Sequence, residues 1–306
     1  MKTVTLEVES GEENVRIDRF LSDKLENLSR SYIQKLIKNE GLLVNGKVVK
    51  ANYKTAVEDI VKLDIPDTTV PDIVPEDIPL DIIYEDEDFL IVNKPKNMVV
   101  HPAAGHYEHT LVNALMYHCQ DRLSGINGVL RPGIVHRIDQ NTTGSLVVCK
   151  NDTAHRALAE QLAVHDITRK YRAICIGILP EDNYTIEGNI GRSLKDRKKM
   201  AVLPQGGKAA VTHVRVLERL QKGYTYVECT LETGRTHQIR VHMAHLGYPI
   251  LGDELYGPKK SPVAHLTGQT LHAMVLGFRH PSTGVYVEFQ APLPDYFTEL
   301  LRKLNS

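Results

Sequence analysis

A polar loop at residues 136–144 lies between two apolar segments of the sequence. It contains one carboxylate, Asp139, and one guanidinium, Arg137, two residues earlier. A carboxylate presented between rigid strands can act as a nucleophile or as a base. An isolated aspartate in such a loop more often caps a turn, so the loop alone does not establish a catalytic site. Three side chains after Asp139 are expected to hydrogen-bond the turn, namely Asn141, Thr142 and Thr143.

The elements around this loop predict an α+β domain. Ile134 and Val135 are predicted to end one strand, residues 145–149 to form the next, and Gly144 to relax the backbone between them. Further strands are predicted at 81–85, 89–95, 170–177, 210–218, 224–232 and 285–292, and helices near 109–119, 153–165, 236–246 and 295–304. Because strands mostly follow one another through turns, we expect a mixed, mostly antiparallel sheet with flanking helices.

The loop resembles the motif His-Arg-Leu-Asp-x-x-Thr-Ser-Gly of the RluA family of pseudouridine synthases. Five of its residues stand at the same spacing here: His136, Arg137, Asp139, Thr142 and Gly144. Ile138 replaces leucine and Thr143 replaces serine, and both replacements preserve size and polarity. The resemblance makes Asp139 the expected catalytic carboxylate.

Two further segments resemble the second and third motifs of that family. "ITRKYRAICIG" places Tyr171 at the position of the family's active-site tyrosine, and "LETGRTHQIRVHMAHLGYPILGDELYG" places Arg240 at that of its arginine. With "IVNKPKNMVVHP" at residues 91–102, the likeness covers most of residues 80–292. It implies the pseudouridine synthase fold, with a central RNA-binding cleft.

The implied reaction breaks the N1–C1′ bond of uridine, turns the uracil and joins C5 to C1′. Asp139 is expected to attack the sugar or to remove a proton at C2′, and the sequence does not separate these routes. Arg240 would pair with Asp139, and Tyr171 would pack on the uracil and help to remove the C5 proton. We expect no cofactor and no metal, because the isomerisation needs neither a redox step nor an energy source.

A stacked base must leave the RNA helix before these groups can reach it. His136 and Arg137 are expected to hold the displaced nucleotide or its phosphate. A second basic strip is expected to contact the RNA backbone through Arg192, Arg197, Lys198 and Lys199. Residues 189–222 contain nine basic and two acidic side chains, so phosphate contact is plausible there.

Residues 1–70 form a separate pattern of two amphipathic helices, the second capped by Ser29 and ended by Gly41, followed by a hairpin that turns at Asn45-Gly46. The pattern resembles an S4 domain, a small RNA-binding module. Its expected RNA-binding residues are Arg16, Arg19, Arg30, Lys35 and Lys38. Residues 15–56 contain nine basic and four acidic side chains, although the net charge of the whole chain is -1. Residues 71–80 are expected to be a linker, and residues 81–306 the catalytic domain.

Two rival functions follow from other residues. His242 and His245 are three residues apart on a predicted helix, as metal ligands can be, but His237 is rotated off their face and the sequence has no HExxH motif, so a metal-dependent hydrolase is disfavoured. Asp253 is a second acid, expected to be structural. A non-catalytic ribosome-assembly factor that only holds RNA is the other alternative.

Within the family, the third motif and the S4-like module resemble the RluD branch. That resemblance implies structured RNA as partner, most specifically 23S rRNA or a large-subunit precursor, and a role in rRNA modification and ribosome biogenesis. An RluC-like enzyme of rRNA or an enzyme of tRNA is the alternative. No apolar run is long enough to span a membrane, and the four cysteines form no CxxC pair, so we expect a cytoplasmic monomer.

Overall fold

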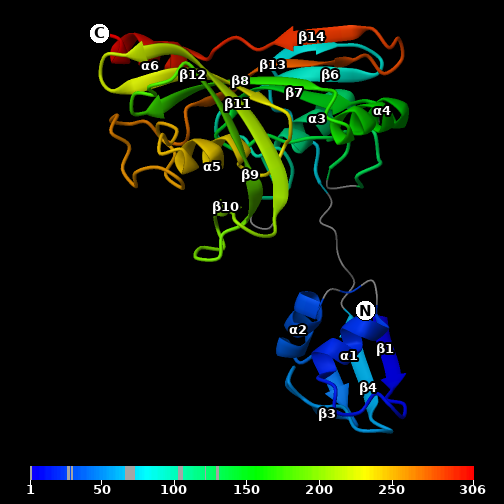
Figure 1. Cartoon of the computed structure of the whole chain (residues 1–306). Coiled ribbons are helices and arrows are strands. Elements are labelled where there is room, and N and C mark those ends of the chain that lie inside the picture. The colour runs from blue at the N-terminus through cyan, green and yellow to red at the C-terminus, as the bar shows by residue number, and fades with distance from the viewer. Residues whose placement is uncertain are drawn as a thin grey trace. The chain divides into compact units, whose positions relative to one another are not determined.

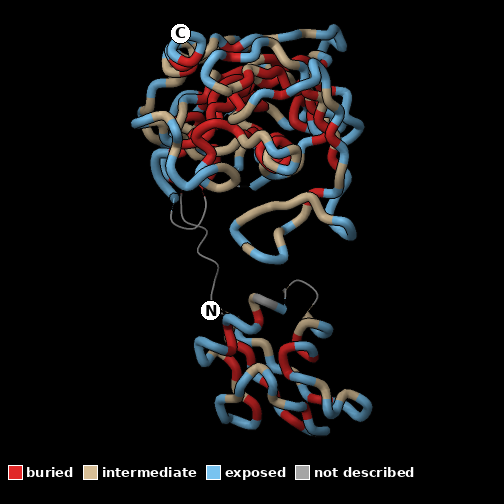
Figure 2. Tube along the Cα trace, turned by 60° about the vertical axis from the view of Figure 1, so that its left-hand side comes forward, coloured by how far each residue is buried: buried red, intermediate tan, exposed pale blue. Residues whose placement is uncertain are grey.

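The computed structural model describes residues 2–25, 28, 30–65, 73–102, 106–120, 122–128 and 131–306 of the chain, and the side chains of all of these except residues 2 and 31. It divides into two compact units, Met1–Val70 and Pro71–Ser306. In each unit the buried residues lie on the inner strands and on the helix faces that cover them (Figure 2). No helix among the described residues is long and apolar enough to cross a bilayer.

The N-terminal unit combines two helices with a four-stranded antiparallel sheet (Figure 1). Its elements are β1 (Lys2–Glu7), α1 (Ile17–Lys24), α2 (Arg30–Lys38), β2 (Leu42–Val44), β3 (Lys47–Val48) and β4 (Ile60–Ile65). Asn45 and Gly46 both have positive φ angles, as the predicted type I′ turn requires. The edge strand β1 and its inner neighbour β4 were not predicted. Ser29, the expected cap of α2, lies outside the described residues.

A buried carboxylate joins the two helices of this unit. Asp18 of α1 accepts hydrogen bonds from Arg16, from Arg30 of α2 and from Gln34 of α2. Burial alone would raise the pKa of Asp18, but these bonds lower it well below its usual range. Arg30 therefore links α2 to α1, and both Arg16 and Arg30 still present half-exposed charge.

The C-terminal unit is built on a ten-stranded sheet in the order β10-β9-β11-β12-β8-β13-β7-β6-β5, with β14 paired to β13 (Figure 1). The strands are β5 (Ile82–Glu85), β6 (Phe89–Lys94), β7 (Thr143–Cys149), β8 (Thr168–Ile176), β9 (Asn183–Arg192), β10 (Met200–Leu203), β11 (Lys208–Leu220), β12 (Tyr224–Leu231), β13 (Leu271–Arg279) and β14 (Tyr286–Gln290). Every pairing is antiparallel except the one between β13 and β7. The predicted mixed, mostly antiparallel sheet is confirmed.

Four helices flank this sheet: α3 (Leu111–Cys119), α4 (Asp152–Ala163), α5 (Gln238–His245) and α6 (Asp295–Leu304). All seven residues of β7 are buried, because this strand lies inside the sheet with apolar clusters on both faces. Leu146 and Val148 pack with α3, whereas Val147 and Cys149 pack with α4. The strand that follows the loop of Asp139 is thus held in the middle of the core.

The predicted helices all occur, with ends that differ by a few residues, but the strands were predicted less completely. β9, β10 and β13 were missed, and β13 is the strand that pairs with β7 just after the loop of Asp139. The strand predicted to end at Ile134 and Val135 is wrong, because Ile134 makes only one isolated bridge, to Val148. β9 and β10 form a hairpin that extends beyond the body of the sheet (Figure 1).

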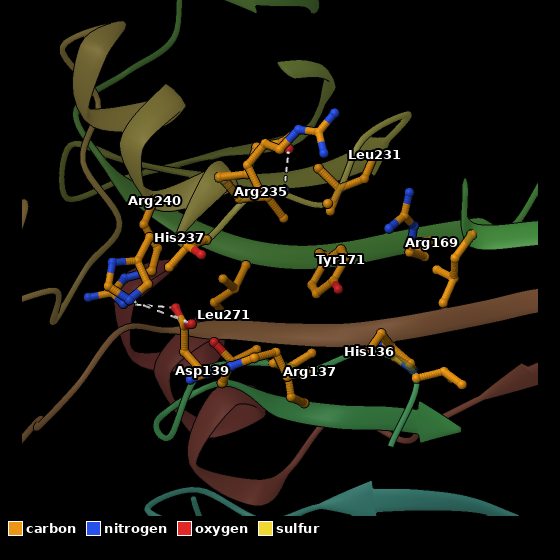
Figure 3. A pocket seen from close by; sticks show the side chains of 18 of the residues that line it. His136, Arg137, Asp139, Arg169, Tyr171, Leu231, Arg235, His237, Arg240 and Leu271 are labelled. Carbon is orange, nitrogen blue, oxygen red and sulfur yellow. Dashed lines mark hydrogen bonds and ion pairs between the residues drawn. The ribbon is translucent and has the colours of Figure 1, made fainter. Parts of the chain in front are cut away.

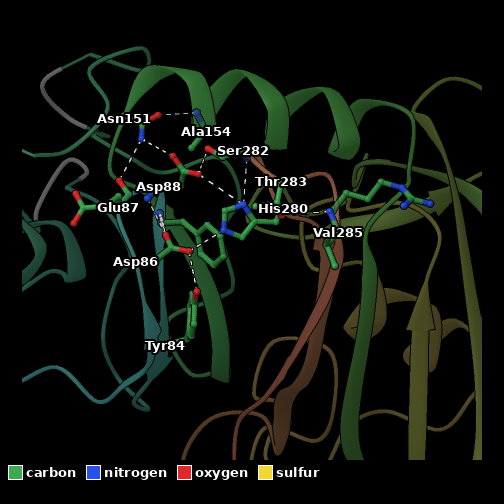
Figure 4. A network of polar contacts seen from close by, with 12 residues as sticks. Tyr84, Asp86, Glu87, Asp88, Asn151, Ala154, His280, Ser282, Thr283 and Val285 are labelled. Carbon is green, nitrogen blue, oxygen red and sulfur yellow. Dashed lines mark hydrogen bonds and ion pairs between the residues drawn. The ribbon is translucent and has the colours of Figure 1, made fainter.

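A polar network fastens three turns at one edge of the sheet (Figure 4). His280, after β13, contacts Asp86 through Nε2 at 2.9 Å, in the turn between β5 and β6. Asp88 of the same turn accepts hydrogen bonds from Ser282 and from Asn151, the N-cap of α4. These bonds tie the β13–β14 hairpin to the β5–β6 turn and to the start of α4.

Candidate active site

The loop that carries Asp139 runs directly into β7 where this strand pairs in parallel with β13. Gly144 lies opposite Ala273 with φ +108°, and a Cβ atom at this glycine would collide with the main chain of Ala273. Any other residue would push the two strands apart, so the predicted backbone freedom of Gly144 is confirmed. Asp139 thus lies four residues before a fully buried strand.

Hydrogen bonds from neighbouring segments fix the loop. The buried ammonium of Lys94 donates to the carbonyls of Gln140 at 2.9 Å, Met98 at 2.9 Å and Pro95 at 2.7 Å. Thr142 Oγ1 accepts from Gln269, and Thr143 Oγ1 bonds the ring of His272. The expectation that these side chains bond the turn itself is wrong. They bond residues at and just before β13, and the buried Oδ1 of Asn141 has no partner within the described chain.

Arg240, on α5, lies between two carboxylates. Its Nη1 donates to Asp139 Oδ2 at 2.8 Å, while Nε and Nη2 donate to the two oxygens of Asp253 at 2.7 and 2.9 Å (Figure 3). Burial alone would lower the pKa of Arg240, but these bonds raise it well above its usual range. The guanidinium is a fixed cation that orients the Asp139 carboxylate.

The segment before α5 is locked by one side chain. Gln238 Oε1 accepts from Thr233 Oγ1 and from the Arg235 amide, and Gln238 Nε2 donates to Val211 O and Thr212 Oγ1 of β11. Because Gln238 is the first residue of α5, these bonds set where the helix begins. The "GRTHQIR" segment therefore places Arg240 through its own glutamine.

Tyr171 reaches the site from β8. Residues 169, 171, 173 and 175 of this strand point to one face, so Arg169 and Tyr171 are neighbours there (Figure 3). Burial raises the pKa of Tyr171, and its hydroxyl is therefore protonated near neutral pH. A free phenolate base at this position is disfavoured, whereas a hydroxyl that relays a proton is compatible with the geometry.

His136 and Arg137 differ in their surroundings. Burial, together with nearby Arg169, lowers the pKa of His136 to about 4, and its Nε2 accepts a hydrogen bond from the Val147 amide at 3.1 Å. A neutral ring that accepts from β7 cannot attract a phosphate as a cation, so the contacts of His136 indicate a role in positioning the loop. Arg137 is exposed at the pocket and has no ion-pair partner among the described residues.

Two side chains that were not predicted complete the site. His237 precedes α5 with φ +57°, and its Nε2 lies 3.7 Å from Asp139 Oδ1. Its Nδ1 lies 2.8 Å from the hydroxyl of Tyr256. Both residues belong to the segment that contains Arg240, which is the only sequence feature that pointed to them.

These side chains line a pocket of about 380 Å³ (Figure 3). Asp139, Arg240 and His237 lie at one side of it, Tyr171 lies in the middle with Leu271, and Arg169 and His136 lie toward the other side. A pocket of this size fits one flat, polar ring with an attached sugar better than a long ligand. It is partly apolar and basic, with one carboxylate.

The profile of the RNA pseudouridylate synthase family matches residues 88–245, more than half of the chain. This range includes Asp139, Tyr171 and Arg240. The chain belongs to this family. A second profile, that of the S4 domain, matches residues 15–61.

Relatives support the same assignment along the whole length of this pseudouridine synthase. It is 52% identical to an uncharacterized RNA pseudouridine synthase, YlyB, of Bacillus subtilis, with 100% of this chain and 99% of the relative aligned. It is 48% identical to ribosomal large subunit pseudouridine synthase D of Zymomonas mobilis, with 94% and 93% aligned. The solved structure of human RNA pseudouridylate synthase domain containing 1 is 28% identical, covers 74% of this chain and 95% of its own, and has a TM-score of 0.57. The predicted enzyme class is confirmed.

The other predicted RNA-binding residues of this pseudouridine synthase lie outside the pocket. Arg192, Arg197 and Lys198 are exposed at the tip of the β9–β10 hairpin, and Lys199 is half-buried. Arg192 donates to the Arg197 carbonyl, which stiffens the tip. In the N-terminal unit Arg19, Lys35 and Lys38 are exposed.

The two histidines considered as metal ligands, His242 and His245, have different surroundings. His242 is fully buried and bonds Thr212 of β11, whereas His245 is exposed. No group of three histidine, cysteine or acidic side chains suited to a metal occurs in the described part of the chain. The pair on α5 thus does not share one face toward a ligand.

Proposed function

We propose that this pseudouridine synthase isomerises uridines of large-subunit ribosomal RNA, 23S rRNA, and that Asp139 is its catalytic carboxylate. The observation that carries the proposal is the ion pair of Asp139 with Arg240 at 2.8 Å inside a pocket that also contains Tyr171. A carboxylate with one oxygen held by a fixed cation keeps lone pairs on its other oxygen that can face a sugar. The ribosomal target is supported by the Zymomonas relative, whose name specifies the large ribosomal subunit.

In the reaction the N1–C1′ bond breaks, and Asp139 either forms a bond to C1′ or removes the proton at C2′. The released uracil turns while it is held beside Tyr171. C5 then bonds to C1′ as the Asp139–C1′ bond breaks or, in the other route, as Asp139 returns the proton to C2′. The C5 proton leaves and N1 gains a proton, so atoms and charge balance with no external reagent. Tyr171, with its hydroxyl protonated, would relay the C5 proton, and Arg240 would hold the carboxylate in line.

The target base must be extruded from its helix to enter the pocket. Arg137 is exposed at the pocket. It is placed to fill part of the space that the displaced nucleotide leaves in the helix, or to contact the phosphate of that nucleotide. Residues 1–70, as an S4-type RNA-binding module, and the basic strip at 192–199 would hold the RNA backbone from other sides. We propose residues 71–80 as the linker between that module and the catalytic domain, residues 81–306.

Modification of a ribosomal precursor would make the enzyme part of ribosome biogenesis in the cytoplasm. We propose a monomer as the active species. An RluC-like specificity or a tRNA target would use the same pocket and differ only in RNA docking. A metal-dependent hydrolase predicts loss of activity in excess chelator, and we expect activity to survive.

Mapping of pseudouridines tests the proposal. Carbodiimide treatment and primer extension of rRNA and tRNA from cells that lack the protein should show loss of signal in one or a few 23S positions. The wild-type gene should restore them, and Asp139→Ala should not. Glu254→Gln, which removes an exposed carboxylate close in sequence to the site, is the matched control and should restore them.

Three outcomes would contradict parts of the proposal. Persistence of every pseudouridine without the protein would refute activity on cellular rRNA and tRNA. Restoration by Asp139→Ala would refute the role of that carboxylate. Loss of pseudouridines in tRNA alone would support the reaction but would make tRNA, not 23S rRNA, the substrate.

A further inference from the structure

The Asp139 carboxylate has a second neighbour besides Arg240. Arg240 takes Oδ2, and the Nε2 atom of His237 faces Oδ1 at 3.7 Å. This separation is about 0.7 Å longer than a full hydrogen bond, and such bonds in active sites often tighten only when substrate is bound. The two oxygens of the carboxylate are therefore approached by two different side chains of the same segment (Figure 3).

The ring of His237 is held by Tyr256. The two rings meet edge to face with centroids 5.6 Å apart, and His237 Nδ1 lies 2.8 Å from Tyr256 Oη. Burial lowers the pKa of His237 and raises that of Tyr256, so both are neutral near pH 7. A neutral imidazole carries one proton, and the hydrogen bond at one nitrogen decides which nitrogen carries it.

The hydroxyl of Tyr256 is itself oriented by the main chain of β10. The amide of Met200 can only donate, and it donates to Tyr256 Oη at 2.9 Å. The oxygen of Tyr256 is thus an acceptor from Met200, and its proton is available to Nδ1 of His237. The Asp139 carboxylate that Nε2 faces can only accept, so the contacts at the two nitrogens together favour Nε2 as the protonated one.

We propose that His237 is a positioning residue that donates its Nε2–H to Asp139, and that Tyr256, held by Met200, fixes it in that tautomer. The proposal rests on the proposed role of Asp139. His237 acts through the carboxylate: it holds Oδ1, as Arg240 holds Oδ2, and so sets the plane of the group that meets the sugar.

The same chain of contacts joins the basic hairpin to the site. Met200 begins β10, directly after the residues of the hairpin tip that we propose as RNA contacts. Two further contacts hold Tyr256. Its amide donates to Asp253, and its ring lies 5.1 Å from the Arg240 guanidinium. A displacement of β10 on RNA binding would therefore shift the ring of His237, because Tyr256 bonds both Met200 and His237.

Nitrogen NMR of the histidine rings gives a readout that does not depend on activity. His237 is assigned by its loss in His237→Gln, and the full-length protein should show its ring as the Nε2–H tautomer. Tyr256→Phe keeps the ring and removes the hydroxyl, and it should shift His237 to a mixture of tautomers. Tyr248→Phe, which removes another half-buried hydroxyl of this unit, is the control and should leave the tautomer unchanged.

Kinetics on a saturating RNA substrate give the second arm. Tyr256→Phe and His237→Asn should lower kcat roughly 10- to 100-fold with KM unchanged, because a misoriented catalytic group affects the chemical step. Asparagine tolerates the positive φ of this position, so a loss in His237→Asn does not reflect backbone strain. His237→Gln places an amide donor near the Nε2 position and should retain most of kcat. Adding Tyr256→Phe to His237→Gln should then cost nothing further, because no Nδ1 remains to be oriented.

The Nδ1–H tautomer in the wild-type protein would overturn the proposal, as would full activity of His237→Asn or a loss seen only in KM. Equal losses in His237→Gln and His237→Asn would show that the ring is merely structural. A wild-type protein that shows the expected tautomer but isomerises no RNA would refute the proposed function, and the two failures are thus distinguished.

Discussion

Asp253 is completely buried and binds Arg240 through both carboxylate oxygens, at 2.7 and 2.9 Å. Its Oδ1 also accepts the amides of Leu255 and Tyr256, which fixes the turn that follows. Arg240 could otherwise adopt many rotamers, and a single contact to Asp139 would not hold it. The geometry of the Asp139 carboxylate therefore depends on an acid that does not bond to it.

Asp253→Asn should lower the single-turnover rate about 100-fold, because Arg240 is released from its second anchor and the Asp139 carboxylate is misplaced. The free energy of unfolding should fall by about 3 kcal/mol, since one partner of a buried pair loses its charge. Rapid-quench assays and urea unfolding measure the two effects. Glu254→Gln removes an exposed charge at the next residue and should change neither, and a normal rate in Asp253→Asn would contradict the anchoring role.

Tyr171→Phe should keep RNA affinity and stability but lower the rate roughly 100-fold, the usual contribution of one positioned proton-transfer group. The hydroxyl has no hydrogen-bond partner within the described residues, so its removal leaves no orphaned group in the protein. Tyr171→Leu should in addition weaken binding, because the aromatic face is lost. Equal activity of Tyr171→Phe and wild type would restrict Tyr171 to packing on the base.

Stability should fall as the pH is lowered from 6.5 toward 4, and His242 should account for part of the fall. Burial, with His245 nearby, lowers the pKa of His242 to about 4, so below pH 6.5 the unfolded chain binds a proton that the folded chain refuses. The contribution is at most about 1.4 kcal/mol per pH unit. His242→Asn keeps a polar group beside Thr212 and should make the melting temperature depend less steeply on pH. His265→Asn, at an exposed position, is the control and should not change that dependence.

Arg197→Gln with Lys198→Gln should weaken RNA binding and lower the slope of log affinity against log salt by about 1.5, as expected for two lost phosphate contacts. Arg302→Gln with Lys303→Gln removes the same charge from exposed positions on α6 and is the matched control. Filter binding at several salt concentrations measures the slopes. Identical slopes in both variants would exclude phosphate contact at the hairpin tip.

Deletion of residues 1–70 should weaken RNA binding and flatten its salt dependence while the chemistry at Asp139 persists at high enzyme concentration. The described core of the C-terminal unit is complete in itself, so the deletion should leave a folded catalytic unit. Circular dichroism checks folding, and single-turnover assays check chemistry. An unchanged salt slope would count against RNA contact in the N-terminal unit.

The sequence predicted the parts of the site that lie in short motifs with a local cause. Gly144 and the Asn45-Gly46 turn follow from backbone sterics, and Asp139, Tyr171 and Arg240 stand in segments that resemble family motifs. His237 was set aside because a continuous helix would rotate it away from His242. The structure instead starts α5 at Gln238 and puts His237 in a left-handed conformation that turns its ring toward Asp139.

Contacts between distant segments could not be predicted from the sequence. The strand β13 carries a glycine and a histidine within an apolar run, and its parallel pairing with β7 depends on residues more than a hundred positions away. Tyr256 reads as an ordinary turn tyrosine until its contacts with Met200 and His237 are seen. Such partners are chosen by tertiary packing, which local patterns do not encode.

The placement of Asp139 at the entrance of β7 has one further consequence. That strand is buried along its whole length, so its amides should exchange with solvent only when the domain unfolds as a whole. Asp139 lies four residues before this strand, in a loop that Lys94 holds through the Gln140 carbonyl, so we expect the carboxylate to stay in place and not to swing out to meet a stacked base. The distortion that brings uridine and aspartate together must then be borne by the nucleic acid, at a cost of a few kcal/mol for unstacking, and weakly paired or looped uridines become the cheapest to modify.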